Sequence, residues 1–157
     1  MELIGKAPIN PILFYSGKIS GYITWIILFL LLFGFEIFDN PVKNNITYIS
    51  FLFIIVGSIF ILSSLISLGH SIRLGIPIED TVLKIKEMYK ISRNPMYVGF
   101  NSLTISSMLF TQNILIAVLG IYSIYIYHLI IIAEEQFLEK RFGNEYDNYK
   151  RSTRRYL

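Results

Sequence analysis

The feature that most constrains this chain is a long apolar run, residues 46–68, that contains no charged side chain. A helix of this length can cross the ~30 Å hydrocarbon layer of a membrane with some tilt. Residues 19–38 form a second run of similar length, in which Glu36 is the single charged residue. Because lipid offers no hydrogen-bond partners to the backbone, such runs must be helical. We therefore predict an all-α membrane protein.

Two further apolar runs follow, at residues 97–111 and 113–133. The polar pair Gln112 and Asn113 separates them, which predicts a tight helical hairpin. The four runs predict about four transmembrane helices, at about 19–38, 46–68, 97–111 and 113–133, in a single domain that covers residues 1–157. An even number of spans places both termini on the same side.

The composition supports a membrane protein and excludes several kinds of site. The chain is 54% hydrophobic and 16% charged, whereas soluble domains carry nearer a quarter charged residues. It has no cysteine, so disulfides, thiolate metal sites and cysteine nucleophiles are excluded. No metal site is predicted. Pro8 and Pro11 interrupt the N-terminal residues 1–18, which we expect to form a short interfacial segment with Leu13, Phe14 and Tyr15 at the lipid headgroups.

Basic residues are concentrated in two segments, the loop after residue 68 and the C-terminal tail. These residues are Arg73, Lys84, Lys86, Lys90 and Arg93 in the loop, and Lys140, Arg141, Lys150, Arg151, Arg154 and Arg155 in the tail. The positive-inside rule predicts that both segments, and both termini, are cytoplasmic. We expect an integral, multi-pass protein, located in the cell membrane if the source is prokaryotic. The tail is expected to contact anionic membrane lipids, and no nucleic-acid partner is expected.

Two polar clusters lie at the predicted cytoplasmic side. In the first, residues 92–99, Pro95 directs the backbone at the start of a helix and Gly99 allows a ligand or another backbone to approach closely. The second is the pair Glu134 and Glu135, which point roughly 100° apart on a helix. Adjacent acids at a membrane boundary suggest a cationic partner. The alternative is that Glu134 pairs with a cation at the interface and Glu135 is solvated.

S-adenosylmethionine has the charges that these clusters would bind. Its sulfonium and ammonium groups would be stabilised by the two glutamates, and its carboxylate by Arg93 or Asn94. Many other ligands combine these charges, so the chemical match alone does not identify the ligand.

The same segments resemble a known enzyme family. Residues 93–99 (Arg-Asn-Pro-Met-Tyr-Val-Gly) resemble the Arg-His-Pro-x-Tyr-x-Gly motif of isoprenylcysteine carboxyl methyltransferases. Glu134 and Glu135, with Phe-Gly-x-x-Tyr-x-x-Tyr at residues 142–149, resemble a C-terminal signature that these enzymes share with phospholipid methyltransferases. Residues 69–76 are similar to a segment of bacterial members. The resemblance covers residues 69–155.

This resemblance implies a membrane methyltransferase that uses S-adenosylmethionine, with a pocket formed by the cytoplasmic loop and a C-terminal helix. It implies that Tyr146 and Tyr149 close the pocket. The implied cofactor-binding residues are Arg93, Asn94, Pro95, Tyr97, Gly99, Glu134 and Glu135. The resemblance implies that Arg141 orients an acceptor carboxylate. An amine acceptor would need a base, and we expect Glu135 to be that catalytic residue.

The chain departs from the family pattern at two positions. Asn94 replaces the family's histidine, which retains hydrogen bonding but removes a titratable group. Glu87 stands where the family often has glycine before an aromatic residue. The acceptor stays open between the carboxylate of an isoprenylcysteine-like substrate and the amine of a phospholipid.

Three other functions remain possible from the sequence. Membrane reductases of the sterol-reductase type resemble this family in their C-terminal half and use NADPH. A non-enzymatic membrane scaffold would leave the two polar clusters without a function. His70 and His128 could ligate a haem, although a hydrogen-bonded interior role is expected for His128. The sequence does not determine the oligomeric state.

Overall fold

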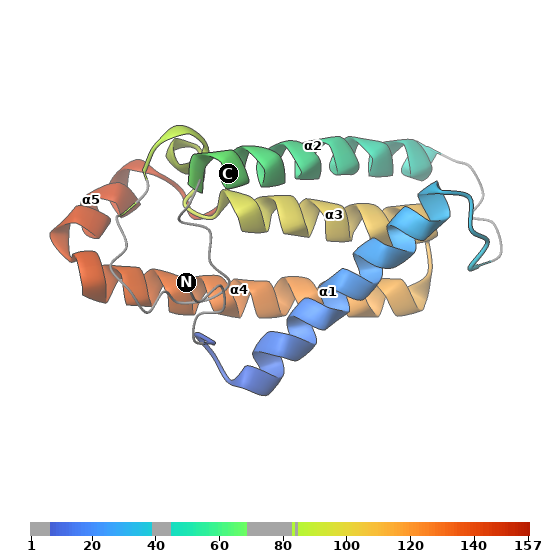
Figure 1. Cartoon of the computed structure of the whole chain (residues 1–157), viewed down its shortest axis with the longest axis horizontal. Coiled ribbons are helices and arrows are strands. Elements are labelled where there is room, and N and C mark those ends of the chain that lie inside the picture. The colour runs from blue at the N-terminus through green and yellow to red at the C-terminus, as the bar shows by residue number, and fades with distance from the viewer. Residues whose placement is uncertain (1–6, 39–44, 69–82, 84) are drawn as a thin grey trace.

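The computed structural model describes residues 7–38, 45–68, 83 and 85–157, and in these ranges it contains helices and no strand. The helices are α1 (Pro11–Leu32), α2 (Asn45–Leu68), α3 (Pro95–Thr111), α4 (Ile114–Phe142) and α5 (Asn144–Ser152), with a short 3-10 helix, η2 (Glu87–Lys90), before α3 (Figure 1). The all-α prediction is confirmed for the described part of the chain.

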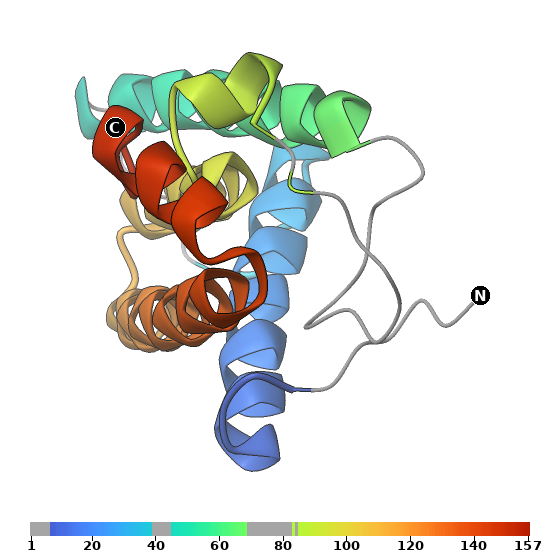
Figure 2. The same cartoon turned by 90° about the vertical axis from the view of Figure 1, so that its left-hand side faces the viewer.

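Helix α3 is at the centre of the arrangement, in contact with α1, α2 and α4. It runs antiparallel to α4, and α1 crosses both of them obliquely (Figure 1). Figure 2, seen from the end of the molecule, shows α2 lying across α3 and α1 standing against the side of α3 and α4. Gln112 adopts a left-handed φ of 47°, and the Asn113 side chain caps α4 by accepting the N–H of Leu115 at 2.9 Å. The predicted hairpin is therefore present.

In the described part of the chain three helices, α1, α2 and α4, are long and apolar enough to cross a membrane. Helix α3 has 17 residues and is shorter. Its serines are buried and bind neighbouring backbones: Ser106 donates to the carbonyl of Ser50 on α2 at 2.8 Å, and Ser107 to that of Thr24 on α1 at 2.7 Å. Small polar residues of this kind hold membrane helices together at short distances.

Glycine pairs allow close helix contacts at two crossings. Gly17 and Gly21 of α1 lie against α4, where a methyl group on Gly17 would clash with Ile126. Gly99 of α3 faces Gly57 of α2, and a methyl group on Gly99 would lie 2.9 Å from the Gly57 carbonyl oxygen. Gly99 therefore allows the approach of another backbone, which is one of the two roles expected for it.

Helix α1 does not coincide with the apolar run 19–38 that was expected to form the first span. Helix α1 starts at Pro11, not residue 19, because the Asn10 side chain accepts the N–H of Ile12 and proline is favoured at the first position of a helix. It ends at Leu32, not residue 38, because Gly34 adopts a φ of +86° and terminates it. Phe14, expected at the headgroups, is buried in the core.

The helix of the fourth apolar run continues past that run. Helix α4 extends to Phe142, beyond the span expected at 113–133, and carries Glu134 and Glu135 in the helical geometry that the sequence predicts for them. At ~1.5 Å per residue its 29 residues span roughly 43 Å, more than the hydrocarbon layer requires. Helix α4 is therefore longer than a span requires, and its last turns carry the polar residues from Glu134 onward.

The departure at Glu87 has a conformational consequence. Glu87 adopts a positive φ of 53°, which glycine reaches without strain and glutamate rarely adopts. Its carboxylate accepts a hydrogen bond from Ser67 on α2 at 2.6 Å. The backbone thus follows a path suited to glycine even though the residue is not glycine.

Some sequence-based expectations lie outside the described residues. They concern the glycine-containing segment 69–76, the haem interpretation of His70, and the basic side chains of Arg73 and Lys84.

Candidate functional site

The site is assembled where α3 begins, where α4 passes beside it, and where the C-terminal segment returns to α3. The N–H of Arg93 donates to the carbonyl of Arg154 at 2.9 Å, and the hydroxyl of Ser92 donates to that of Arg155 at 3.1 Å. Ser92 is fully buried and Thr153 nearly so. The segment after α5 is therefore hydrogen-bonded to the residues that precede α3.

Glu135 is bound by three side chains from two different segments. Arg93 donates to both of its oxygens, from Nε at 3.1 Å and Nη2 at 3.2 Å. Asn94 adds a hydrogen bond of 2.9 Å, and Arg155 donates from Nε at 3.0 Å with Nη2 at 2.9 Å. The residue is 4% exposed. Its carboxylate is thus enclosed and satisfied by the protein itself.

The Arg93 side chain also has all of its nitrogens hydrogen-bonded within the protein. Its third nitrogen, Nη1, donates to the carbonyls of Thr153 at 2.6 Å and Lys150 at 3.3 Å. Burial lowers the pKa of the Arg93 guanidinium, but hydrogen bonds and the charge of Glu135 outweigh it, so the net pKa is raised. Arg93 therefore stays charged and ties α3, α4 and α5 together.

Glu134, one residue earlier on α4, lies in a different environment. It is partly buried, and within the described part of the chain its one hydrogen-bond donor is the hydroxyl of Tyr97, at 3.0 Å. The Tyr97 ring packs against those of Tyr127 and Phe100, with centroids 5.7 and 6.0 Å away. Glu134 thus presents a carboxylate beside an aromatic cluster, without the arginines that bind Glu135.

Tyr89, on η2, connects the loop to this region. Burial and the negative charge of Glu134 both raise the pKa of the Tyr89 hydroxyl, so it remains protonated at physiological pH. The Tyr89 carbonyl accepts a hydrogen bond from the hydroxyl of Tyr149. Tyr149 and Tyr146 are both buried in α5, with their rings edge to face at 5.9 Å. Of the two tyrosines expected to close a pocket, Tyr149 therefore anchors α5 to η2, and Tyr146 packs beside it.

The remaining predicted site residues are Arg141, Pro95 and Gly99. Arg141 is in the last turn of α4, about 6 Å from the rings of Phe137 and Phe142. It lies two turns beyond Glu134 on the same helix face. Pro95 is buried at the first position of α3, and Gly99 faces α2. The structure thus brings Arg93, Asn94 and Glu135 together, and pairs Tyr97 with Glu134.

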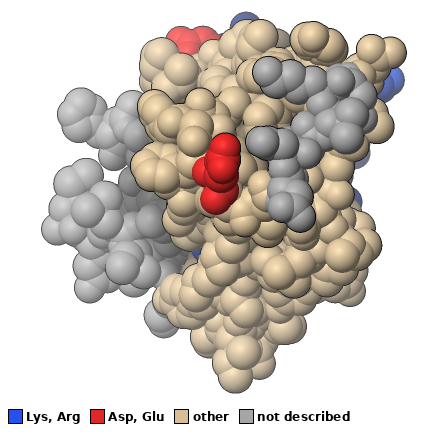
Figure 3. Space-filling model, turned by 90° about the vertical axis from the view of Figure 1, so that its right-hand side faces the viewer, with Lys and Arg blue, Asp and Glu red and all other residues tan. Residues whose placement is uncertain are grey.

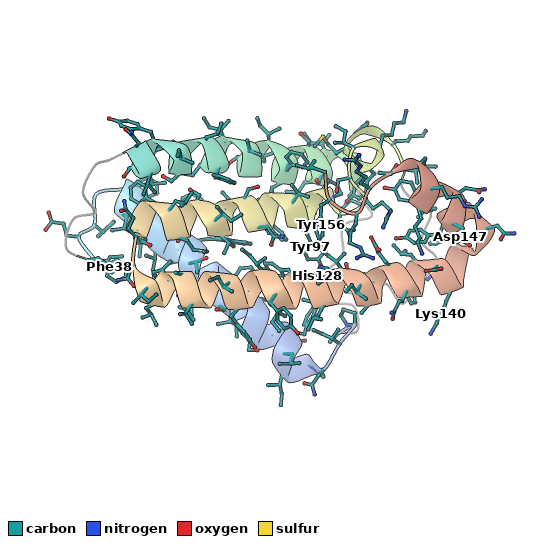
Figure 4. The ribbon with its side chains drawn as sticks, turned by 180° about the vertical axis from the view of Figure 1, so that it is seen from behind. Phe38, Tyr97, His128, Lys140, Asp147 and Tyr156 are labelled. Carbon is teal, nitrogen blue, oxygen red and sulfur yellow. The ribbon has the colours of Figure 1, made fainter. Side chains whose placement is uncertain are left out.

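His128 contacts the other side of the C-terminal segment. Its Nδ1 lies 2.6 Å from the hydroxyl of Tyr156, and the two rings stack (Figure 4). The expectation of a hydrogen-bonded His128 is confirmed. Among the residues that the structure describes, no group of three or more histidine, aspartate or glutamate side chains could hold a metal ion.

The basic residues of the tail have a structural role that the sequence did not reveal. The sequence predicts a lipid contact for the basic residues there, whereas Arg155 binds Glu135 and Lys150 binds Glu139 at 2.9 Å. A carboxylate buried at the end of an apolar run needs a cation nearby. This requirement was the feature of the sequence from which a cationic partner for Glu135 could be predicted. The sequence alone did not indicate that a second arginine would come from the tail.

Comparison with known families gives one match. The model of the PEMT family, phospholipid methyltransferase, matches residues 45–145. The match starts at the beginning of α2 and ends in α5, so it includes the start of α3 and both glutamates and leaves out α1 and the C-terminal segment. No curated protein and no solved structure matches the chain.

Proposed function

Because the chain belongs to the phospholipid methyltransferase family, we propose that it transfers a methyl group from S-adenosylmethionine to a lipophilic acceptor at the membrane. The observation that carries this proposal is the environment of Glu134. This carboxylate is partly buried beside aromatic rings and is bound in the described region by one hydroxyl, that of Tyr97. A carboxylate in these surroundings favours a cationic ligand. The sulfonium and ammonium groups of the donor are both cationic.

The side chains present fit the donor if the roles expected from the sequence are redistributed. Glu134 and Tyr97 would hold its cationic groups. Arg93 has all three nitrogens engaged with the protein, so it would act with Asn94, Pro95 and Glu135 as the wall that positions Tyr97. Gly99 would support this wall through the close contact of α3 with α2. When bound, the donor supplies an activated methyl group on positively charged sulfur.

Methyl transfer by direct displacement makes few acid–base demands. The bond from carbon to the acceptor forms as the bond to sulfur breaks, and alignment of the two reactants gives most of the rate gain. An amine acceptor must also lose a proton. Glu135 accepts four hydrogen bonds from protein groups and is 4% exposed. We therefore assign the base for an amine acceptor to Glu134, and the orientation of an anionic acceptor group to Arg141.

We further propose that α3 is a fourth transmembrane helix and that the site faces the cytoplasm. Helix α3 lies between α2 and α4 and runs antiparallel to α4 (Figure 1). The end of the molecule opposite α5 shows few charged atoms in the described part (Figure 3). The basic residues of η2 and α5 lie at the other end, in agreement with the positive-inside rule. Both termini would then be cytoplasmic.

Donor binding by the detergent-purified protein tests this function. We expect micromolar binding of S-adenosylmethionine or S-adenosylhomocysteine, and transfer of labelled methyl groups to membrane lipid. Glu134→Gln should weaken binding by roughly 10-fold or more. Glu139→Gln, at a partly exposed ion pair, is the matched control and should bind like the wild type. Binding of NADPH in place of the donor would overturn the proposal, because it would indicate a reductase.

A further inference from the structure

Helix α1 contains a single charged residue, Lys18, within an otherwise uncharged sequence. Its side chain is partly buried, and its ammonium nitrogen lies 4.1 Å from the centre of the Phe14 ring. Charged residues within membrane helices are energetically unfavourable and commonly mark functional sites. Lys18 lies outside the segment that matches the family.

Lys18 is connected to Glu134 through a continuous set of packed side chains. Phe14, the ring below Lys18, belongs to a core cluster with Tyr127 and Ile130 of α4, and Tyr97 packs against the same cluster. Tyr97 in turn donates to Glu134. The cation on α1 and the carboxylate on α4 therefore flank one aromatic cluster.

The opposite charges of Lys18 and Glu134 are not joined by a salt bridge. Within the described ranges neither residue is in a salt bridge with any other residue. Partly buried charges that lack an oppositely charged partner in contact are unfavourable. The unfavourable energy of both would be relieved by one molecule that carries a negative and a positive group.

We propose that Lys18 binds the anionic oxygen group of a zwitterionic ligand whose cationic group lies at Glu134. This inference rests on the proposed function and identifies the chemistry of what the site binds. Two zwitterions would have this chemistry: the amino-acid end of the methyl donor, with its carboxylate, and the headgroup of an aminophospholipid, with its phosphate. In either case α1 contributes a binding residue to a site otherwise built by α3 and α4.

Three soluble probes separate these sources when titrated into the purified full-length protein. S-adenosylhomocysteine carries the amino-acid zwitterion, and 5′-methylthioadenosine lacks it. Glycerophosphoethanolamine carries the lipid headgroup. The variants are Lys18→Gln, which removes the charge, and Lys18→Arg, which keeps it. Lys140→Gln, at an exposed position near the end of α4, is the matched control.

If the ligand is the donor, Lys18→Gln weakens S-adenosylhomocysteine binding roughly 10- to 100-fold. Lys18→Arg restores most of it, and binding of 5′-methylthioadenosine is unchanged. If the ligand is the lipid headgroup, the same loss appears for glycerophosphoethanolamine and not for S-adenosylhomocysteine.

The inference is overturned if Lys18→Gln leaves both affinities within twofold of the wild type, as Lys140→Gln should. A lower melting temperature with unchanged affinities would likewise overturn it, because Lys18 would then be purely structural. Wild-type protein that binds none of the probes would instead overturn the proposed function, and this inference with it.

Discussion

Glu134 and Glu135 are neighbours in sequence with opposite surroundings. Glu135 is enclosed by Arg93, Asn94 and Arg155, and accepts hydrogen bonds from all three. Glu134 points roughly 100° away on the helix, towards Tyr97, and has no arginine partner in the described region. The comparison teaches that one turn of helix can serve both stability and binding, because adjacent side chains face different neighbours. We assign stability to Glu135 and ligand binding to Glu134.

The largest expected effect is on stability at Glu135. Glu135→Gln removes the charge that compensates buried Arg93, and breaking such a pair should lower the free energy of unfolding by roughly 3–5 kcal/mol. Thermal unfolding in detergent measures this loss. Glu139→Gln, whose pair with Lys150 is partly exposed, should lose less than about 1 kcal/mol. Equal losses in the two variants would remove the distinction between Glu135 and a surface carboxylate.

The next largest loss of stability is expected at Gly99, and it tests whether this glycine serves helix packing or ligand binding. A methyl group at this position would meet the backbone of Gly57 and Ile61 at about 3 Å, so Gly99→Ala should destabilise the protein by roughly 1–3 kcal/mol. At Gly120 the nearest neighbour is the flexible end of Met108, and Gly120→Ala should lose less. Unfolding curves of both variants measure the difference. If Gly99→Ala keeps wild-type stability but loses ligand binding, then Gly99 serves ligand binding and not helix packing.

A smaller effect is expected at the arginine that the tail contributes. The Arg155 side chain is 38% exposed, so its ion pair with Glu135 is partly screened by solvent. Arg155→Gln should therefore destabilise the protein by about 1 kcal/mol, with Arg154→Gln, an exposed neighbour, changing the stability by less than ~0.5 kcal/mol. Chemical denaturation in detergent resolves the two. If both variants behave alike, the tail contributes nothing to the environment of Glu135.

The smallest change in stability is expected at Glu87, which lies in η2 together with Tyr89. Its left-handed φ of 53° favours glycine, so Glu87→Gly should stabilise the protein by up to about 1 kcal/mol. Ser67→Ala removes the hydrogen bond to the Glu87 carboxylate and separates that contribution from the backbone strain. Differential scanning measurements compare the two variants. A loss of stability in Glu87→Gly larger than that in Ser67→Ala would contradict the backbone explanation.

Much of this fold follows from the sequence because its signals are local. Uncharged apolar runs located the helices, and the polar pair Gln112 and Asn113 located the turn of the hairpin. The same reasoning misplaced α1, because Pro11 was interpreted as an interruption although Asn10 makes it a helix start. A helix boundary depends on capping contacts that hydrophobicity does not report.

The site was less accessible to sequence reasoning because its contacts are distant in the chain. The motif at residues 92–99 was expected to lie beside the two glutamates, and the bonds from Arg93 and Asn94 to Glu135 confirm it. Which glutamate would be enclosed depended on Arg155 and on the carbonyls of Thr153 and Lys150. No local pattern links these residues to Arg93, about 60 positions away.

The most direct test of the division between the two glutamates is to measure unfolding and S-adenosylhomocysteine affinity for Glu134→Gln and Glu135→Gln side by side. The account predicts that Glu134→Gln keeps its stability within about 1 kcal/mol of the wild type and loses roughly 10-fold or more in affinity. It predicts that Glu135→Gln loses mainly stability. Wild-type affinity in Glu134→Gln, or a loss of stability as large as that of Glu135→Gln, would contradict it.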